Sequence, residues 1–354
     1  MSKFLIDRYS SLDPYVPGEQ PQDRRYIKLN TNESPYPPSP KAVAAIDEDA
    51  VRGLRLYSDP ECRVVSEAIA EYYGVKRSEV IVGNGSDEIL AFIYAAFCDG
   101  KHKLASPSIS YGFYPVFGAL VGVENYVIPL KNDYSLDVEA FVNCPDNVIF
   151  ANPNAQTGIA ITLEDVERIV SASSDRLVVV DEAYVDFGAE SAVELTRKYA
   201  NLIVVQTFSK SRSLAGARLG FAIANEALIA DLKAVKFSFN PYNVNRLTEK
   251  LGAEAIRDKE WFNVNRRKII VTREYVRAAL KELGFEVLPS VANFLLARSD
   301  EIGGEALYLA LKARGVLVRH FSDPALKDFV RITVGSGYEM EILIKEIKNI
   351  ITGA

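Results

Sequence analysis

The feature that most constrains this chain is a series of short apolar runs alternating with helix-like segments from about residue 41 onward. Five runs have the composition of buried strands: 80–82, 147–150, 177–180, 202–205 and 220–224. Segments 61–73, 86–98 and 163–172 carry apolar residues at helical spacing. Apolar strands separated by helices are typical of parallel sheets covered on both faces. We therefore expect an α/β fold with a mostly parallel central sheet in a large domain.

The pattern changes after about residue 240. A long charged helix is expected over 258–283, followed by strand-like runs at 285–288, 293–297, 315–319 and 329–334 and a closing helix at 338–352. This order predicts a smaller α+β domain. The first 40 residues are rich in Pro, Tyr, Asn and Ser, which favours an extended arm. We expect an arm over 1–40, a large domain over 41–245 and a small domain over 246–354.

Net charge and cysteine content argue against several classes of function. The chain has 354 residues and a formal net charge of −6, which disfavours a nucleic-acid partner. No uncharged apolar stretch reaches the roughly 18 residues of a membrane span, and no signal peptide is visible at the N-terminus. Three widely spaced cysteines predict reduced thiols in the cytoplasm. With two histidines and no CxxC motif, we expect neither a zinc site nor a histidine-based triad.

A single lysine, Lys210, follows the apolar run at 202–205 in a polar segment. Arg218 comes eight residues later. A lysine amine attacks an aldehyde only when it is neutral, and burial or nearby positive charge favours that form. The segment is therefore a candidate for a Schiff base beside a phosphate. Taken alone, a solvated loop lysine is the more ordinary explanation.

A glycine-rich turn, G-N-G-S-D-E at 83–88, follows the first strand-like run and opens an apolar helix. Such a turn presents free backbone N–H groups of a helix N-terminus to an anion. The alternative is that Ser86 caps the helix. The segment lacks the lysine of a P-loop and the spacing of a GxGxxG motif.

Charged residues mark two other strand-like runs. Asp181 and Glu182 follow the run at 177–180, and ligands of open α/β sheets bind at such strand ends. A carboxylate there is costly unless it is paired or functional, so a salt bridge or helix cap is the alternative. Arg319 and Arg331 lie in strand-like runs of the second domain and indicate either a planar anion partner or structural ion pairs.

The order of these segments along the chain resembles that of the fold-type-I pyridoxal-phosphate aminotransferases, and most closely that of the histidinol-phosphate aminotransferase family. The matching segments are N-E-S-P-Y-P-P-S-P at 32–40, G-N-G-S-D-E at 83–88, V-D-E-A-Y at 180–184, T-F-S-K at 207–210, L-A-G-A-R at 214–218 and R-I-T-V-G at 331–335. The resemblance implies pyridoxal 5′-phosphate as cofactor. It implies amino transfer between L-histidinol phosphate and 2-oxoglutarate, which gives imidazole acetol phosphate and L-glutamate in histidine biosynthesis.

The resemblance also implies roles for individual residues. Lys210 would bind the cofactor covalently, Asp181 would hold a proton on its ring nitrogen, and Tyr184 would hydrogen-bond its ring oxygen O3′. The other residues expected to bind the cofactor are Gly85, Ser86, Asp87, Tyr111, Asn154, Thr207, Ser209 and Arg218, with Tyr57 reaching the phosphate in the partner subunit. The substrate would meet three residues, partly supplied by the arm: Tyr15, Arg319 and Arg331. A homodimer with shared sites follows.

One segment departs from the family pattern. Residues 152–158 read N-P-N-A-Q-T-G where relatives typically have N-P-N-N-P-T-G, so Ala155 and Gln156 replace Asn and Pro. Asn154 is then the candidate for the O3′ contact that Ala155 cannot make. Other functions would share the cofactor residues: an aromatic or broad-specificity aminotransferase, an L-threonine-phosphate decarboxylase, or a pyridoxal-phosphate-fold protein kept for binding or regulation.

Overall fold

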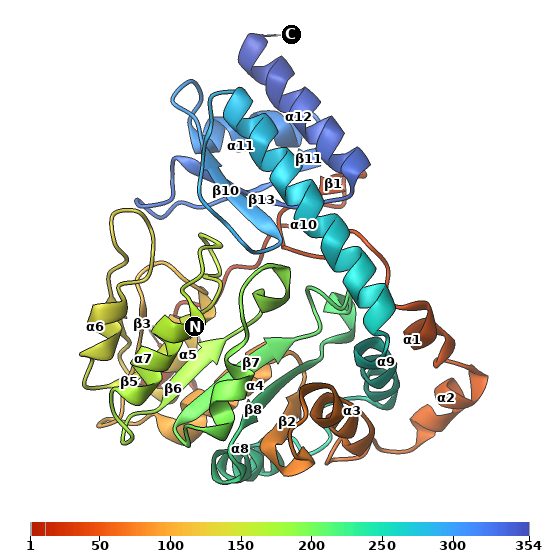
Figure 1. The fold of residues 1–354 in the computed structure, drawn as a ribbon, viewed down its shortest axis with the longest axis vertical. Coiled ribbons are helices and arrows are strands. Elements are labelled where there is room, and N and C mark those ends of the chain that lie inside the picture. The colour runs from red at the N-terminus through yellow and green to blue at the C-terminus, as the bar shows by residue number, and fades with distance from the viewer. Residues whose placement is uncertain (1, 11, 354) are drawn as a thin grey trace.

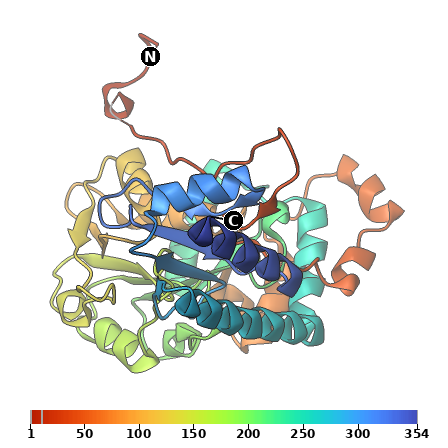
Figure 2. The same cartoon turned by 90° about the horizontal axis from the view of Figure 1, so that it is seen from above.

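The computed structural model describes residues 2–10 and 12–353 (Figures 1 and 2). Its central sheet has the strand order β2-β8-β7-β6-β5-β3-β4. The strands are β2 (Val80–Gly83), β3 (Leu104–Pro107), β4 (Tyr126–Ile128), β5 (Asn147–Ala151), β6 (Val178–Asp181), β7 (Leu202–Thr207) and β8 (Gly220–Ala224). β8 pairs antiparallel with both of its neighbours, and the strands from β7 to β4 pair in parallel. The expected α/β fold with a mostly parallel sheet is confirmed.

Helices cover both faces of this sheet because successive strand side chains point in opposite directions. Val178 and Val180 of β6 belong to one buried apolar cluster, and Val179 between them belongs to another. The first cluster includes α3 (Arg63–Tyr73), α6 (Val138–Val142), α7 (Leu163–Ser171) and α9 (Arg246–Arg257). The second includes α4 (Ser86–Phe97), α5 (Phe113–Val121) and α8 (Glu226–Phe239). The short helices α1 (Pro40–Ala44) and α2 (Glu48–Arg52) precede α3.

The smaller domain is built on an antiparallel sheet with the order β12-β13-β10-β9. Its strands are β9 (Glu286–Val287), β10 (Phe294–Arg298), β12 (Arg319–His320) and β13 (Phe329–Thr333). The helices are α10 (Lys259–Glu282), α11 (Gly304–Ala313) and α12 (Gly337–Thr352), and Figure 1 shows α10 extending from this domain toward α9. The predicted α+β character is therefore present.

The N-terminal arm is mostly extended, as expected, and joins the smaller domain. Its strand β1 (Ile27–Lys28) pairs in parallel with β11 (Val316–Leu317), and Leu29 is buried in that domain's core. The first residues of the arm project from the body of the molecule (Figure 2). None of the helices in the described part of the chain is long and apolar enough to cross a membrane.

Candidate active site

Loops at the carboxyl ends of β2, β5, β6 and β7 meet around a cavity of about 440 Å³. Motifs far apart in the sequence therefore lie together, as expected at this edge of a parallel sheet. The predicted site residues that line the cavity are Ser86, Asp87, Tyr111, Asp181, Tyr184, Thr207, Ser209, Lys210 and Arg218. The arm closes one side with Gln20, Thr31 and Glu33.

Lys210 follows β7 and points toward the arm. Its Nζ donates a hydrogen bond of 3.1 Å to the carbonyl oxygen of Thr31 and lies 5.8 Å from the ring centroid of Tyr184. Burial, and then the positive charge of Arg331, lower the pKa of Lys210 to about 8. A substantial fraction of this amine is thus neutral near physiological pH, which is the form that reacts with an aldehyde.

Asp181 is the last residue of β6 and is 3% exposed. Its Oδ2 accepts a hydrogen bond of 2.9 Å from the hydroxyl of Tyr114, and its Oδ1 accepts one of 3.2 Å from the backbone N–H of Ala183. Burial raises the pKa of Asp181 to about 6. A buried carboxylate with only neutral donors is suited to pair with a cation that enters the cavity.

The neighbouring Glu182 has a different environment. Its carboxylate accepts hydrogen bonds from the Ser191 hydroxyl, the Ala192 N–H and the Gln206 amide, and it does not line the cavity. Burial raises its pKa to about 7. Glu182 therefore ties β6 to β7 and to the segment after β6, and only the first member of the acidic pair faces the site.

The N-terminus of α4, called the anion seat below, has the features of an anion-binding site. The helix begins at Ser86, and its N-cap is Gly85 with a φ of +85° and no side-chain cap, so the alternative that Ser86 caps the helix is wrong. A Cβ at Gly85 would lie 2.5 Å from Nη2 of Arg218, and one at Gly220 would lie 2.3 Å from the N atom of Ser86. Glycine therefore allows backbone N–H groups and a guanidinium to converge, which favours a phosphate.

Hydroxyl and carboxylate groups complete this seat. Thr207 Oγ1 donates to Ser209 Oγ at 3.0 Å, and Arg218 Nη2 contacts Asp87 Oδ2 at 2.9 Å. The hydroxyl of Tyr111 donates to the other oxygen of Asp87 at 2.6 Å. An anion seat, a buried carboxylate and a lysine on one cavity fit the phosphate, ring nitrogen and aldehyde of pyridoxal phosphate.

Of the two residues expected to contact O3′ of the cofactor ring, Tyr184 lines the cavity and Asn154 does not. The hydroxyl of Tyr184 accepts a hydrogen bond of 3.1 Å from Nδ2 of Asn32. Asn154 holds its own turn: Oδ1 accepts from the N–H groups of Gln156 and Thr157, and Nδ2 donates to the carbonyl of Ile109. Asn154 is not among the residues that line the cavity, and its contact with O3′ stays a prediction.

The three predicted substrate residues, Tyr15, Arg319 and Arg331, lie near one another but are not among the residues that line the cavity. Tyr15 stacks on Phe113 at 4.2 Å between ring centroids, and burial raises its pKa while the charges of Arg331 and Arg319 oppose that shift. Arg319 donates to the carbonyl groups of residues 16 and 17 in the arm. Tyr57, by contrast, is 79% exposed, stacks on Tyr242 at 4.6 Å, and does not line the cavity of its own chain.

Several contacts at the site were not expected from the sequence. The Tyr114 bond to Asp181, the Asn32 bond to Tyr184 and the Thr31 bond to Lys210 join residues far apart in the chain. Asn32 lies in a segment already matched to the family, and Tyr114 follows Tyr111 by three residues, so both carried a weak signal. The Thr31 contact uses a backbone carbonyl, which no side-chain motif can indicate.

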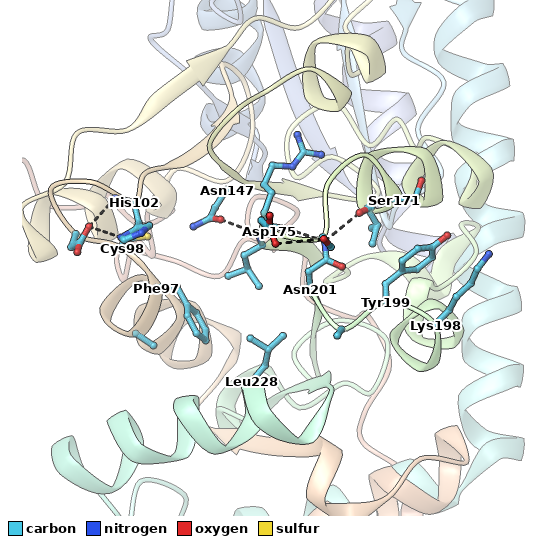
Figure 3. Close-up of a pocket in the computed structure, with 17 residues that line it drawn as sticks. Phe97, Cys98, His102, Asn147, Ser171, Asp175, Lys198, Tyr199, Asn201 and Leu228 are labelled. Carbon is cyan, nitrogen blue, oxygen red and sulfur yellow. Dashed lines mark hydrogen bonds and ion pairs between the residues drawn. The ribbon is translucent and has the colours of Figure 1, made fainter.

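A second hollow of about 660 Å³ lies at the opposite, amino edge of the sheet (Figure 3). Phe97 and Leu228 line one side of it, and Asn201 donates hydrogen bonds to three backbone carbonyls, one of them in the last turn of α7. Arg176, also at its wall, donates to four backbone carbonyls. These polar groups hold the ends of α6 and α7 and the following loops in place, and we assign no chemistry to this hollow. Across residues 2–10 and 12–353, no group of three or more His, Cys, Asp or Glu side chains could hold a metal ion.

Comparisons with known proteins identify the family. The family model described as aminotransferase class I and II matches residues 24–347. Histidinol-phosphate aminotransferase from Brachyspira hyodysenteriae is 49% identical, and the one from Clostridium acetobutylicum is 48% identical; each alignment spans 99% of this chain and 99–100% of the relative.

A solved structure agrees with these relatives in fold. The histidinol-phosphate aminotransferase of Sinorhizobium meliloti, in complex with pyridoxal-5′-phosphate, superposes with a TM-score of 0.87 at 23% identity, covering 99% of this chain and 100% of that one. The superposition confirms the expected fold type. The family model and the relatives at 48–49% identity confirm the aminotransferase activity and, with it, the pyridoxal-phosphate cofactor expected from the resemblance. This chain belongs to the class I and II aminotransferase family.

Proposed function

We propose that this aminotransferase transfers an amino group between L-histidinol phosphate and 2-oxoglutarate in histidine biosynthesis. Support comes from full-length relatives of that name at 48–49% identity. It also comes from Arg331, whose hydrogen bonds all go to neutral oxygens. This partly buried guanidinium without an acidic partner is the single observation that carries the proposal, because it calls for a substrate with an anionic end.

Pyridoxal phosphate, when bound, supplies an aldehyde for the substrate amine and a ring that accepts electrons from the substrate carbon. Lys210, as a neutral amine, would remove the proton from that substrate carbon and deliver it to C4′, the cofactor carbon that carried the aldehyde. Asp181 keeps a proton at the ring nitrogen, because a cation there stabilises its buried carboxylate. Tyr184 would hold the ring oxygen O3′, and Arg218 would hold the phosphate. The arm contacts Lys210 through the carbonyl of Thr31, which would limit the access of water to this amine.

We further propose a homodimer in which Tyr57 completes the partner's site. Its exposure, and its absence from the lining of the cavity of its own chain, support this role. The segments 51–64 and 239–242, which include its stacking partner Tyr242, carry further exposed apolar residues: Val51, Leu54, Leu56, Val64 and Phe239. Exposed apolar side chains of this kind suit a self-complementary interface. The free cysteines Cys62, Cys98 and Cys144 fit a reducing, cytoplasmic setting.

A substrate panel on the purified protein tests the activity. With 2-oxoglutarate as acceptor, we expect kcat/KM for histidinol phosphate to exceed that for phenylalanine by about 100-fold or more, since only the former brings a phosphate to the arginines. A preference for phenylalanine would instead support an aromatic aminotransferase. Release of carbon dioxide from L-threonine phosphate without amino transfer would support the decarboxylase.

A further inference from the structure

Gln156 occupies the position where the resembling family has proline, and its side chain reaches Arg331. We propose that Gln156 is a specificity-determining residue, an inference that rests on the proposed function. Its amide holds the Arg331 guanidinium in place while the substrate site is empty. It then turns and donates a hydrogen bond to the anionic end of the substrate.

The hydrogen-bond partners of Arg331 are all neutral. Nη1 donates to Gln156 Oε1 at 2.9 Å and to the Ala155 carbonyl at 3.2 Å, and Nη2 donates to the Asn30 carbonyl at 3.4 Å. Nε is buried and has no hydrogen-bond partner. The rings of Phe294 and Phe321 lie 5.2 and 5.3 Å from the guanidinium carbon. The guanidinium is thus fixed in orientation but retains capacity for an anion.

Among these acceptors, only Gln156 can move without moving the backbone. The carbonyl of Ala155 belongs to a turn held by Asn154, and the carbonyl of Asn30 belongs to the arm next to β1. Gln156 is half-buried, and three torsions connect its amide to the chain. An incoming anion can therefore displace this one contact at low cost and leave the others in place.

The chemistry of an amide explains why glutamine suits this position. An anion on Arg331 would approach Oε1, and two acceptors repel each other. Rotating the amide exchanges Oε1 for Nε2, which then donates to the anion. Aspartate or glutamate here would occupy Arg331 permanently, and proline has no donor. The residue thereby adds one hydrogen bond that exists only when carboxylate or phosphate is bound.

The backbone of Gln156 has a separate and structural role. Its N–H donates to Asn154 Oδ1 at 2.9 Å, a bond that proline could not make. Variants must therefore distinguish the side chain from the backbone. Gln156→Leu keeps the N–H and the approximate size, Gln156→Pro removes both the amide and the N–H, and Gln156→Glu places an acid beside Arg331.

The test measures binding of glutarate, a dicarboxylate without a reactive amine, to the pyridoxal-phosphate-loaded protein by calorimetry. We expect Gln156→Leu to raise the Kd of glutarate about 10-fold, the loss of one charge-assisted hydrogen bond. Gln156→Glu should raise it about 100-fold or more, because the substrate must displace an ion pair. Gln156→Pro should behave like Gln156→Leu. The absorption spectrum of the bound cofactor should remain that of the wild type in all three.

If Gln156→Leu binds glutarate with wild-type affinity, the inference is overturned. This holds even if Gln156→Glu binds glutarate poorly, because the acid added beside Arg331 would then explain that loss. Loss confined to Gln156→Pro would also overturn it, since only the backbone contact would matter. Should Gln156→Leu fail to fold, Gln156→Met carries the same comparison. Failure of the proposed function is a separate result: wild-type protein would bind glutarate but not transfer the amino group of histidinol phosphate.

Discussion

Lys210 shows at the scale of one residue how burial prepares a side chain for chemistry. Desolvation is the largest cause of its lowered pKa, about 8 instead of the usual 10.5. In cofactor-free protein, the rate constant for capture of pyridoxal phosphate should rise about tenfold per pH unit below pH 8 and then level off. Stopped-flow absorbance measures this directly. A rate that keeps rising to a midpoint near 10.5 would show that the amine is not perturbed.

Asp181 has the opposite shift, and its sign gives a stability prediction. Its pKa rises from 3.8 to about 6 in the folded, cofactor-free protein, so folding favours the protonated form. The associated stability is present below pH 3.8 and is lost as pH rises through 6. Asp181→Asn removes the charge, and near pH 7 it should raise the stability of cofactor-free protein by up to about 3 kcal/mol.

The same substitution should reduce turnover by about 1,000-fold, because the ring nitrogen loses its anionic partner. Melting temperatures of cofactor-free wild type and Asp181→Asn at several pH values are the measurement. The difference between them should shrink as the pH falls from about 6 toward 3.8. A variant that is less stable at every pH would mean that the carboxylate is not desolvated in the empty site.

Individual site residues were predictable where a motif carries the chemistry. Lys210, Asp181, Ser86 and Arg218 follow strands or open a helix, so strand order alone brings them to one edge. The contact from Gln156 to Arg331 links two residues that are 175 apart in sequence. No local pattern specifies such a pair, because it depends on how the two domains pack.

At the scale of elements, the strands of the central sheet that were predicted, β2 and β5 to β8, are those that are buried and also contain a continuous apolar run. β5 to β8 are apolar nearly throughout and agree with the expected runs within two residues at each end. β3 and β4 were missed. β3 ends in a proline, and β4 lies at the sheet edge, where Tyr126 and Val127 are exposed. The expected single run at 315–319 is divided between two sheets as β11 and β12, a tertiary effect.

The start of α4 carries a prediction about cofactor affinity. A methyl group at Gly85 would meet Arg218 at 2.5 Å and would require a left-handed backbone conformation that alanine disfavours. Gly85→Ala should raise the Kd for pyridoxal phosphate by about 10- to 100-fold. Gly100→Ala is the matched control, because its Cβ would meet open space. Fluorescence titration compares the two, and equal affinities would exclude the seat at α4.

The whole molecule joins two domains and an arm around one site. Leu29 is buried in the smaller domain, whereas the next residues, 30–32, contact Arg331, Lys210 and Tyr184. The proposed domain division at 40 and 245 remains a prediction. This arrangement makes the smaller domain necessary for the chemistry of the large one, since the arm connects both.

A shared site predicts complementation between two defective variants. Tyr57→Ala and Lys210→Ala should each be nearly inactive at limiting cofactor, the first because the partner's phosphate contact is lost. Mixed dimers contain one intact site, so an equal mixture that exchanges subunits should recover about a quarter of wild-type activity. Activity no greater than that of the separate variants, or a sedimentation mass of 39.2 kDa, would exclude the shared site.

The central claim is that Lys210 binds pyridoxal phosphate. Borohydride reduction of the loaded protein fixes the cofactor on its lysine, and peptide mass spectrometry then locates it. We expect one modified residue, Lys210, and no labelling of Lys210→Ala under the same conditions. Cofactor fixed on another lysine, or on none, would contradict it.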